Sequence, residues 1–338
     1  MFLSDYDYDL PPELIAQKPL EDRSASRMLV LPKNGGSIND AAFEDLPTYL
    51  SAGDVLVLNN TKVSAIRLHG KKSTGALVEA LLLRESSLPN SFMALVKPGK
   101  RLKVGAEIHF AGDLKATVTG EGLNGERELT FFEPISGLTE TLHRFGSVPL
   151  PPYITTALED PDRYQTVFAE HPGSSAAPTA SLHFTKRLME EIAMKGVRIA
   201  YVTLSVGIDT FRPVEATNLD DHVMHGETCT IGDATAGLIN DRKGRLIAVG
   251  TTAVRTIETF ADQDGSVQSG TRDTRIFIKP GYQWRAVDGM LTNFHLPRTT
   301  MLMMISAMVG REPLMNAYAH AIREHYRFLS FGDAMLVI

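Results

Sequence analysis

One stretch decides the fold class of this chain: Leu246-Ile247-Ala248-Val249-Gly250-Thr251-Thr252-Ala253-Val254-Arg255. Its first four residues predict a buried strand, Gly250 ends that strand, and the two threonines are suitable caps for a following helix. In such a unit, backbone N–H groups and the helix dipole face the space beyond the strand, which suits an anion such as a carboxylate or a phosphate. An ordinary strand-to-helix turn fits the same residues, because both the Gly-x-Gly-x-x-Gly spacing of a dinucleotide site and the lysine of a P-loop are absent.

The alternation of apolar strands with helical segments extends through the C-terminal half of the chain. Strands are predicted at residues 197–202, 246–249, 275–278 and 335–338, and helices at residues 186–195, 233–240, 253–261 and 314–324. Such alternation is typical of an α/β layer architecture. We therefore expect an α/β body, a mixed sheet with helices, formed by residues 1–61 and 151–338.

The residues between these two parts of the body have a different pattern. Short alternating stretches at residues 77–83, 92–96, 107–110 and 128–132 are separated by turn residues such as Pro89–Asn90 and Asn124–Gly125. Many short strands with regular turn signals indicate a small antiparallel barrel or sandwich. The sequence thus predicts an inserted antiparallel β-barrel-like module, built of strands alone, at residues 62–150.

This module is basic although the whole chain is acidic. The chain has 34 Lys and Arg against 40 Asp and Glu, a net charge of -6, which argues against a general nucleic-acid coat protein. Residues 61–120 contain ten basic and four acidic side chains, a net charge of +6, which leaves -12 for the remainder. The excess is either a solvated strand surface or a surface for a polyanion.

Cysteine content and hydropathy exclude several classes of protein. Cys229 is the only cysteine, so an intramolecular disulfide framework and a multi-cysteine metal site are both excluded. The apolar run at residues 301–309 is much shorter than the roughly 20 residues of a membrane span. Asp5, Asp7 and Asp9 make the N-terminus acidic where a secretory signal is basic. We expect a cytoplasmic monomer with no membrane contact.

Two segments carry histidines of chemical interest. Thr179 and His183 lie among small residues before a helix, where His183 either exchanges a proton at physiological pH or serves only for capping and packing. His222, His225 and Glu227 form either a metal site or a metal-free acid–base cluster around a polar substrate. The metal interpretation is a weak match, because the two histidines lack the i, i+4 spacing of a zincin.

A third segment is richer in polar residues than a structural loop requires. Asn293 and His295 flank an aromatic residue and precede Pro297. The proline constrains the loop, so these side chains have a limited set of positions. Tyr282 follows a Pro-Gly turn shortly before them. Together with the Gly250 turn, these segments favour an enzyme with a nucleoside-like or anionic substrate.

Taken in order, the motifs resemble those of a known family. They run nearly end to end, and include Asp7-Tyr8-Asp9-Leu10-Pro11, Val57-Leu58-Asn59-Asn60-Thr61, Leu150-Pro151-Pro152-Tyr153-Ile154, Leu182-His183-Phe184, Val249-Gly250-Thr251-Thr252, Leu291-Thr292-Asn293-Phe294-His295-Leu296-Pro297 and Gly332-Asp333-Ala334-Met335. In these motifs the chain is similar to the S-adenosylmethionine:tRNA ribosyltransferase-isomerase family of queuosine biosynthesis.

The resemblance implies an unusual use of S-adenosylmethionine, as a co-substrate whose ribosyl part is transferred. The acceptor is the aminomethyl group of a 7-deazaguanine base at the wobble position of tRNA. The ribosyl group is isomerised to an epoxycyclopentanediol, and adenine and methionine leave. The sulfonium acidifies the C5′ hydrogens, so a base can start the rearrangement. Such chemistry needs acid–base residues and a carboxylate anchor, and we expect no metal and no prosthetic group.

The resemblance also implies which residues form the site. We expect His183, His225, Glu227 and His295 to be catalytic. Substrate binding is expected of Thr179, Asp209, Arg212, Gly250, Thr251, Thr252, Arg255, Tyr282 and Asn293. The histidines, Glu227 and Arg255 should gather with residues 250–252 in one pocket, since ligands of open α/β sheets bind at strand ends.

Two alternatives remain open. One is a diverged or non-catalytic RNA-binding paralogue, and the other is a metal-dependent hydrolase that uses His222, His225 and Glu227. The chain departs from the family pattern near the expected pocket, at Ser181, Ser205, Asp209 and Gly226. Because these residues belong to the expected pocket, the substrate or the efficiency of the reaction could differ from the family's even where the fold does not.

Overall fold

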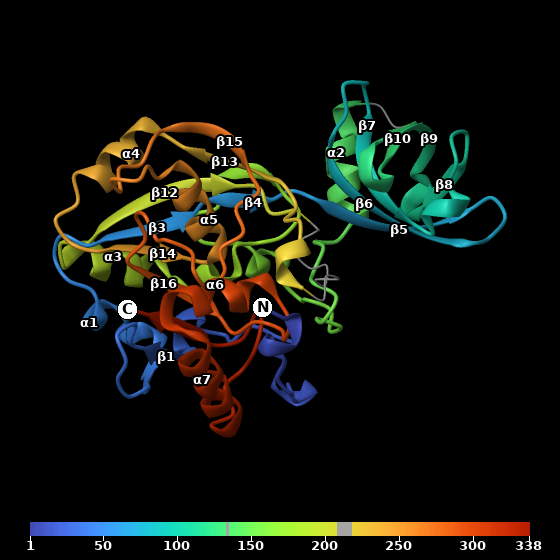
Figure 1. Cartoon of the computed structure of the whole chain (residues 1–338). Coiled ribbons are helices and arrows are strands. Elements are labelled where there is room, and N and C mark those ends of the chain that lie inside the picture. The colour runs from blue at the N-terminus through green and yellow to red at the C-terminus, as the bar shows by residue number, and fades with distance from the viewer. Residues whose placement is uncertain (133–134, 208–217) are drawn as a thin grey trace. The chain divides into compact units, whose positions relative to one another are not determined.

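The computed structural model describes residues 1–132, 135–207 and 218–338. The chain divides into two compact units, both drawn in Figure 1. The larger unit contains residues 1–61, 152–171 and 177–338, and the smaller unit contains residues 62–151 and 172–176.

A nine-stranded mixed sheet forms the centre of the larger unit (Figure 1). Four neighbouring strands run parallel, in the order β12 (Arg198–Leu204), β3 (Val55–Asn59), β14 (Leu246–Val249) and β16 (Gly289–Asn293). Every residue of β3, β14 and β16 is buried, as expected for parallel strands covered on both faces. The flanking strands are β13 (Glu227–Ile231) and β15 (Gly270–Thr274) beside β12, and β17 (Ala334–Val337), β1 (Arg27–Leu31) and β2 (Asn39–Ala42) beside β16.

Six α-helices accompany this sheet in the described part of the larger unit. They are α1 (Leu46–Tyr49), α3 (Lys186–Met194), α4 (Asp233–Asn240), α5 (Thr251–Phe260), α6 (Thr300–Val309) and α7 (Arg311–Arg323). Local sequence explains where several of them begin. The Thr185 hydroxyl, for example, accepts a hydrogen bond of 3.2 Å from the backbone N–H of Leu188 and caps α3. This contact satisfies one of the N–H groups that every helix start leaves unpaired.

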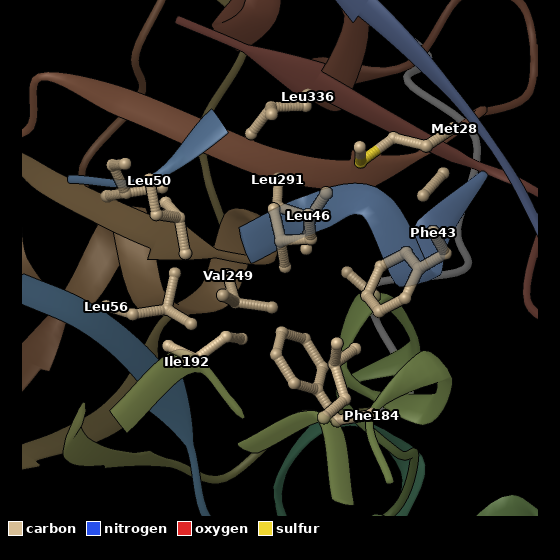
Figure 2. Close-up of a cluster of buried hydrophobic side chains, with 14 of the residues drawn as sticks. Met28, Phe43, Leu46, Leu50, Leu56, Phe184, Ile192, Val249, Leu291 and Leu336 are labelled. Carbon is tan, nitrogen blue, oxygen red and sulfur yellow. The ribbon is translucent and has the colours of Figure 1, made fainter. Parts of the chain in front are cut away.

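The hydrophobic core in Figure 2 joins the sheet to α1 and α3. Leu56 of β3 and Val249 of β14 lie near Ile192 of α3, and Phe43 lies near Phe184. The rings of Phe43 and Phe184 meet edge to face, 5.2 Å between centroids. Each such side chain contributes about 1.5–3 kcal/mol when fully buried, so this core holds the parallel strands in register.

The α/β prediction is confirmed, but one predicted strand is wrong. Residues 275–278 carry no strand, and the edge strand β15 lies just before them at the polar sequence Gly270–Thr274. Residues 270–273 are exposed, so β15 needs only its backbone bonds to β13 and no apolar pattern. The apolar residues 276–278 line a cleft instead. The C-terminal strand begins at Ala334, one residue before its predicted start.

The smaller unit is a closed six-stranded antiparallel barrel, which confirms the predicted β-barrel-like module (Figure 1). The strands around it are β10 (Arg127–Phe131), β7 (Ser91–Lys97), β6 (Leu77–Glu85), β5 (Ile66–Lys72), β8 (Glu107–Phe110) and β9 (Lys115–Glu121). Alternate side chains point inward, as in Ile108 and Phe110 of β8. Gly70 of β5 is required, because a Cβ there would lie 2.6 Å from the His109 carbonyl oxygen.

The expectation of a module built of strands alone is wrong in one respect. Helix α2 (Ile135–Phe145) follows β10. Its Leu138 and Leu142 are buried against the barrel core. Their i, i+4 spacing places both on one face of the helix, which explains why this short segment is helical. Within the described residues, no helix of the chain has the length and apolarity needed to cross a membrane.

Candidate active site

The carboxyl ends of the parallel strands bring polar residues to one edge of the larger unit's sheet. Asn59 ends β3, Gly250 follows β14, and Asn293 ends β16. Gly250 has φ +84°, a backbone conformation that favours glycine, and its N–H donates to the Leu291 carbonyl over 2.7 Å. Helix α5 begins at the next residue. The free N–H groups of its first turn therefore open at this edge, an arrangement that suits an anion.

Asn59 links three elements at the same edge. Its amide nitrogen donates to the Leu204 carbonyl (3.0 Å) and to the Thr252 hydroxyl (3.2 Å). Its amide oxygen accepts from the backbone N–H of Thr61 and of Leu204, each over 3.1 Å. Asn59 thereby orients Thr252 at the start of α5. It is absent from the predicted site, although an amide directly after the apolar run at residues 55–58 is a recognisable signal.

Glu227 and Arg255 form a buried ion pair. The side chain of Glu227 is 1% exposed and that of Arg255 is 7% exposed. The Glu227 carboxylate accepts from the Arg255 guanidinium and from the backbone N–H of Gly207, the latter over 3.2 Å. Burial alone raises the pKa of Glu227, but interactions with His225, Arg255 and Gly207 outweigh it, and the pKa lies below its usual range. Glu227 is therefore ionised at neutral pH.

His225 lies beside this pair and reaches solvent. Its side chain is 25% exposed, and Nε2 lies 3.6 Å from Glu227 Oε1, outside hydrogen-bond distance. Within the described residues, this nitrogen has no hydrogen-bond partner. The backbone carbonyl of His225 accepts from Arg255 Nη2 over 3.4 Å. Part of the His225 side chain thus reaches solvent, while the unpaired Nε2 is itself buried beside Glu227.

These residues line one small cleft with the start of α5. Its polar lining is His225, Glu227, Thr251, Thr252, Arg255 and Thr300, and its apolar lining is Met224, Ile276, Phe277, Ile278, Met301 and Met304. The cleft measures about 30 Å³, which is room for water molecules. Two of its walls are methionines of α6, whose unbranched side chains repack easily.

His183 belongs to a different, buried group. Thr179 Oγ1 donates to Asn293 Oδ1 (2.8 Å), Asn293 Nδ2 lies 3.4 Å from His183 Nε2, and His183 Nδ1 lies 3.1 Å from Ser26 Oγ. The ring also packs on Phe43 at a centroid distance of 4.8 Å. Burial lowers the pKa of His183 to about 4. His183 is therefore neutral at pH 7, and both ring nitrogens are engaged.

His295 and Tyr282 are tied to other parts of the fold. His295 Nε2 lies 2.8 Å from the Thr292 hydroxyl, and burial lowers the pKa of His295 to about 4. The Tyr282 hydroxyl donates to Glu258 of α5 over 2.8 Å. Glu258 is fully buried and also accepts from the backbone N–H groups of residues 285–287, over 2.9–3.1 Å. Tyr282 thus fastens a loop to α5.

The structure divides the predicted site residues into two groups. His225, Glu227, Thr251, Thr252 and Arg255 line the cleft. Thr179, His183 and Asn293 form the buried chain, while Tyr282 and His295 have the separate partners described above. Gly250 stands between the groups, since an added Cβ there would lie 3.7 Å from both Ala180 and Thr252. Asp209 and Arg212 lie outside the described residues.

A metal site needs at least three ligating side chains close together. In the parts of the chain that the structure describes, no three His, Cys, Asp or Glu side chains are grouped so that they could hold a metal ion. His222 packs its ring against Phe277, 5.2 Å between ring centroids. Burial, together with the neighbouring His225, lowers the pKa of His222. The arrangement suits acid–base chemistry on a small polar substrate.

Comparisons with known proteins agree on one family. Residues 3–337 match the family described as "Queuosine biosynthesis protein". A protein of Moorella thermoacetica described as S-adenosylmethionine:tRNA ribosyltransferase-isomerase is 49% identical over 343 aligned positions, which cover 100% of both chains. The crystal structure of S-adenosylmethionine tRNA ribosyltransferase from Thermotoga maritima is 35% identical, with a TM-score of 0.56, and the match covers 99% of this chain and 100% of that one.

Proposed function

This chain belongs to the queuosine biosynthesis protein family, and from that premise we propose that it is an S-adenosylmethionine:tRNA ribosyltransferase-isomerase. The observation that carries the proposal is the 49% identity along the full length of both chains. The enzyme transfers the ribosyl part of S-adenosylmethionine to the aminomethyl-deazaguanine wobble base of tRNA. The product is epoxyqueuosine-tRNA, and adenine and methionine are released.

The cleft supports binding of the methionine part of S-adenosylmethionine. The N-terminus of α5, with Thr251 and Thr252, offers N–H and hydroxyl donors to the methionine carboxylate. Met301 and Met304 provide polarisable walls for the sulfonium end of the substrate. The present volume of about 30 Å³ is too small for the whole molecule, so these flexible side chains must move when it binds.

His225 is our candidate for the base that removes a proton from C5′. A general base needs access to the substrate, and His225 lines the cleft with a side chain that is 25% exposed. Glu227, ionised and held by Arg255, would stabilise the imidazolium that forms. We assign His183 and His295 a positioning role, because burial keeps both neutral and hydrogen-bonded.

The barrel supports binding of the tRNA backbone. Lys71, His109 and Lys115 are directly paired across β5, β8 and β9, so their side chains share one outward face. Lys71 and Lys115 are exposed and, within the described residues, pair with no carboxylate. Two exposed lysines on one face of the barrel, neither of them paired with a carboxylate, offer positive charge to a phosphate backbone. This favours the RNA-binding interpretation over a merely solvated surface.

The experiment that tests the function is adenine release from S-adenosylmethionine. The purified chain is incubated with tRNA carrying the aminomethyl-deazaguanine base, and with the same tRNA carrying unmodified guanine as control. We expect adenine and methionine to be released in equal amounts with the modified tRNA, and neither to be released with the control tRNA. Binding of this tRNA without adenine release would favour the non-catalytic paralogue. Stoichiometric zinc or iron in protein purified without added metal would favour the hydrolase alternative.

A further inference from the structure

A second cavity lies in the larger unit, beside His183. It measures about 20 Å³ and is lined by Pro19, Leu20, Arg23, Ser26, Arg163, Leu182, His183, Ser330 and Phe331. Two arginines, two serines and a histidine give it a polar wall without any carboxylate. The mechanism proposed above uses the cleft at α5, and the two cavities share no lining residue.

The guanidinium groups near this cavity form their hydrogen bonds with backbone carbonyls rather than with carboxylates. Arg23 donates to the backbone carbonyls of Asp162, Gln165 and Leu182 over 2.8–3.3 Å. Arg163 and Arg327 likewise donate to backbone carbonyls. Among the described residues, none of the three arginines forms an ion pair with a carboxylate. Burial and the charge of Arg163 lower the pKa of Arg23, and together they outweigh the opposing charges of Asp160 and Asp162.

The same arginines have buried N–H groups without an acceptor. Among the described residues, Arg163 Nε and Arg327 Nη1 are buried and have no hydrogen-bond partner. A guanidinium can only donate, and a buried donor left without an acceptor destabilises the fold. The hydroxyls of Thr166 and Ser181, in the two chain segments that supply Arg163 and His183, are also buried without a partner. Of these residues Arg163 lines the cavity, so an acceptor bound there would satisfy a donor that the described residues leave unpaired.

We propose that this arginine cavity binds one phosphate group of the RNA substrate. The inference rests on the proposed function, since an RNA substrate supplies the phosphate. Guanidinium groups suit phosphate oxygens because their donors form a planar fork. The cavity is also coupled to the edge where the cleft lies, because His183 contacts Asn293 at the end of β16. A phosphate held here would orient the nucleotide chain relative to the reacting base.

The test is a coupling measurement on an RNA stem–loop that contains the anticodon. Single phosphates are replaced in turn by neutral methylphosphonates, and affinity is measured for the wild-type chain and for Arg163→Gln. We expect one replacement to weaken wild-type binding about tenfold, as for the loss of a charged hydrogen bond, and to have little effect on Arg163→Gln. Arg187→Gln is the matched control, because Arg187 is exposed and pairs with Glu191 and Glu44 in the same unit.

The outcomes separate this inference from the proposed function. If the sensitive phosphate stays sensitive in Arg163→Gln, or if wild type tolerates every replacement, the inference is wrong. A wild-type chain that also releases no adenine from S-adenosylmethionine contradicts the proposed function as well. Should Arg163→Gln fail to fold, Arg163→Lys keeps the charge but lacks Nε. The inference then requires that replacing the sensitive phosphate weakens binding to Arg163→Lys less than it weakens binding to wild type.

Discussion

Replacement of Glu227 by Gln keeps the size of the side chain and removes its negative charge. In the wild-type chain the Glu227 and Arg255 side chains are 1% and 7% exposed. Without its partner, the Arg255 guanidinium remains buried as an uncompensated charge, which typically costs 3–5 kcal/mol. Gln retains one acceptor for Arg255, so we expect the free energy of unfolding to fall by about 3 kcal/mol at pH 7.

The cost should depend on pH in a defined direction. The folded-state pKa of Glu227 lies below its ordinary value of 4.5. A carboxyl group with a lowered folded-state pKa stabilises the fold fully above its unfolded pKa, and the stabilisation is lost as the pH falls through the folded value. The difference between wild type and Glu227→Gln should therefore be largest near neutral pH and shrink below about pH 4.

Trp284 allows this to be measured on the larger unit alone, because it is the only tryptophan of the chain. Urea unfolding is followed by its fluorescence at about pH 7 and about pH 3.5, and the free energy is obtained by linear extrapolation. Glu191→Gln is the control, since Glu191 belongs to an exposed pair with Arg187 and should cost less than about 1 kcal/mol. A loss below about 1 kcal/mol for Glu227→Gln, or an equal loss at both pH values, would refute the reasoning.

Three further predictions concern binding and catalysis. His225→Asn should lower the rate of adenine release by about 10²–10⁴-fold, while calorimetry should show that S-adenosylmethionine still binds. A near-normal rate would exclude His225 as the base. Replacement of Lys100, Arg101 and Lys103 by Glu reverses their charge and should weaken tRNA binding. The slope of log affinity against log salt concentration should fall by roughly 0.7–0.9 per lost phosphate contact, and the affinity for S-adenosylmethionine should not change. An unaltered slope would mean that these exposed side chains are only solvated. Glu258→Gln should lower the free energy of unfolding, measured by the same urea titration, by about 1–3 kcal/mol. The reason is that an amide nitrogen cannot accept hydrogen bonds from the backbone N–H groups of residues 285–287. Unchanged stability would contradict this prediction.

Much of the fold could be predicted from sequence because its signals are local. The apolar runs that became β3 and β14 are bounded by turn residues, and a buried parallel strand needs little more than that. The barrel strands alternate in polarity with a period of two, which reports one inward and one outward face. The prediction of a strand at residues 275–278 is wrong because an apolar run indicates buried side chains without indicating which part of the fold buries them. In the structure, residues 276–278 line the cleft.

The candidate site depended far more on tertiary structure. The sequence by itself determined the family, the turn at Gly250 and the residue types available for acid–base chemistry. Only the fold decided that Arg255 neutralises Glu227, that His183 is closed off beside Asn293 and Ser26, and that His225 reaches the cleft. The physical reason is that burial, ion pairing and hydrogen bonding are set by neighbours far away in the chain. Local patterns of hydropathy and turn residues specify strands and helices, but they carry no record of which side chains those elements bring together.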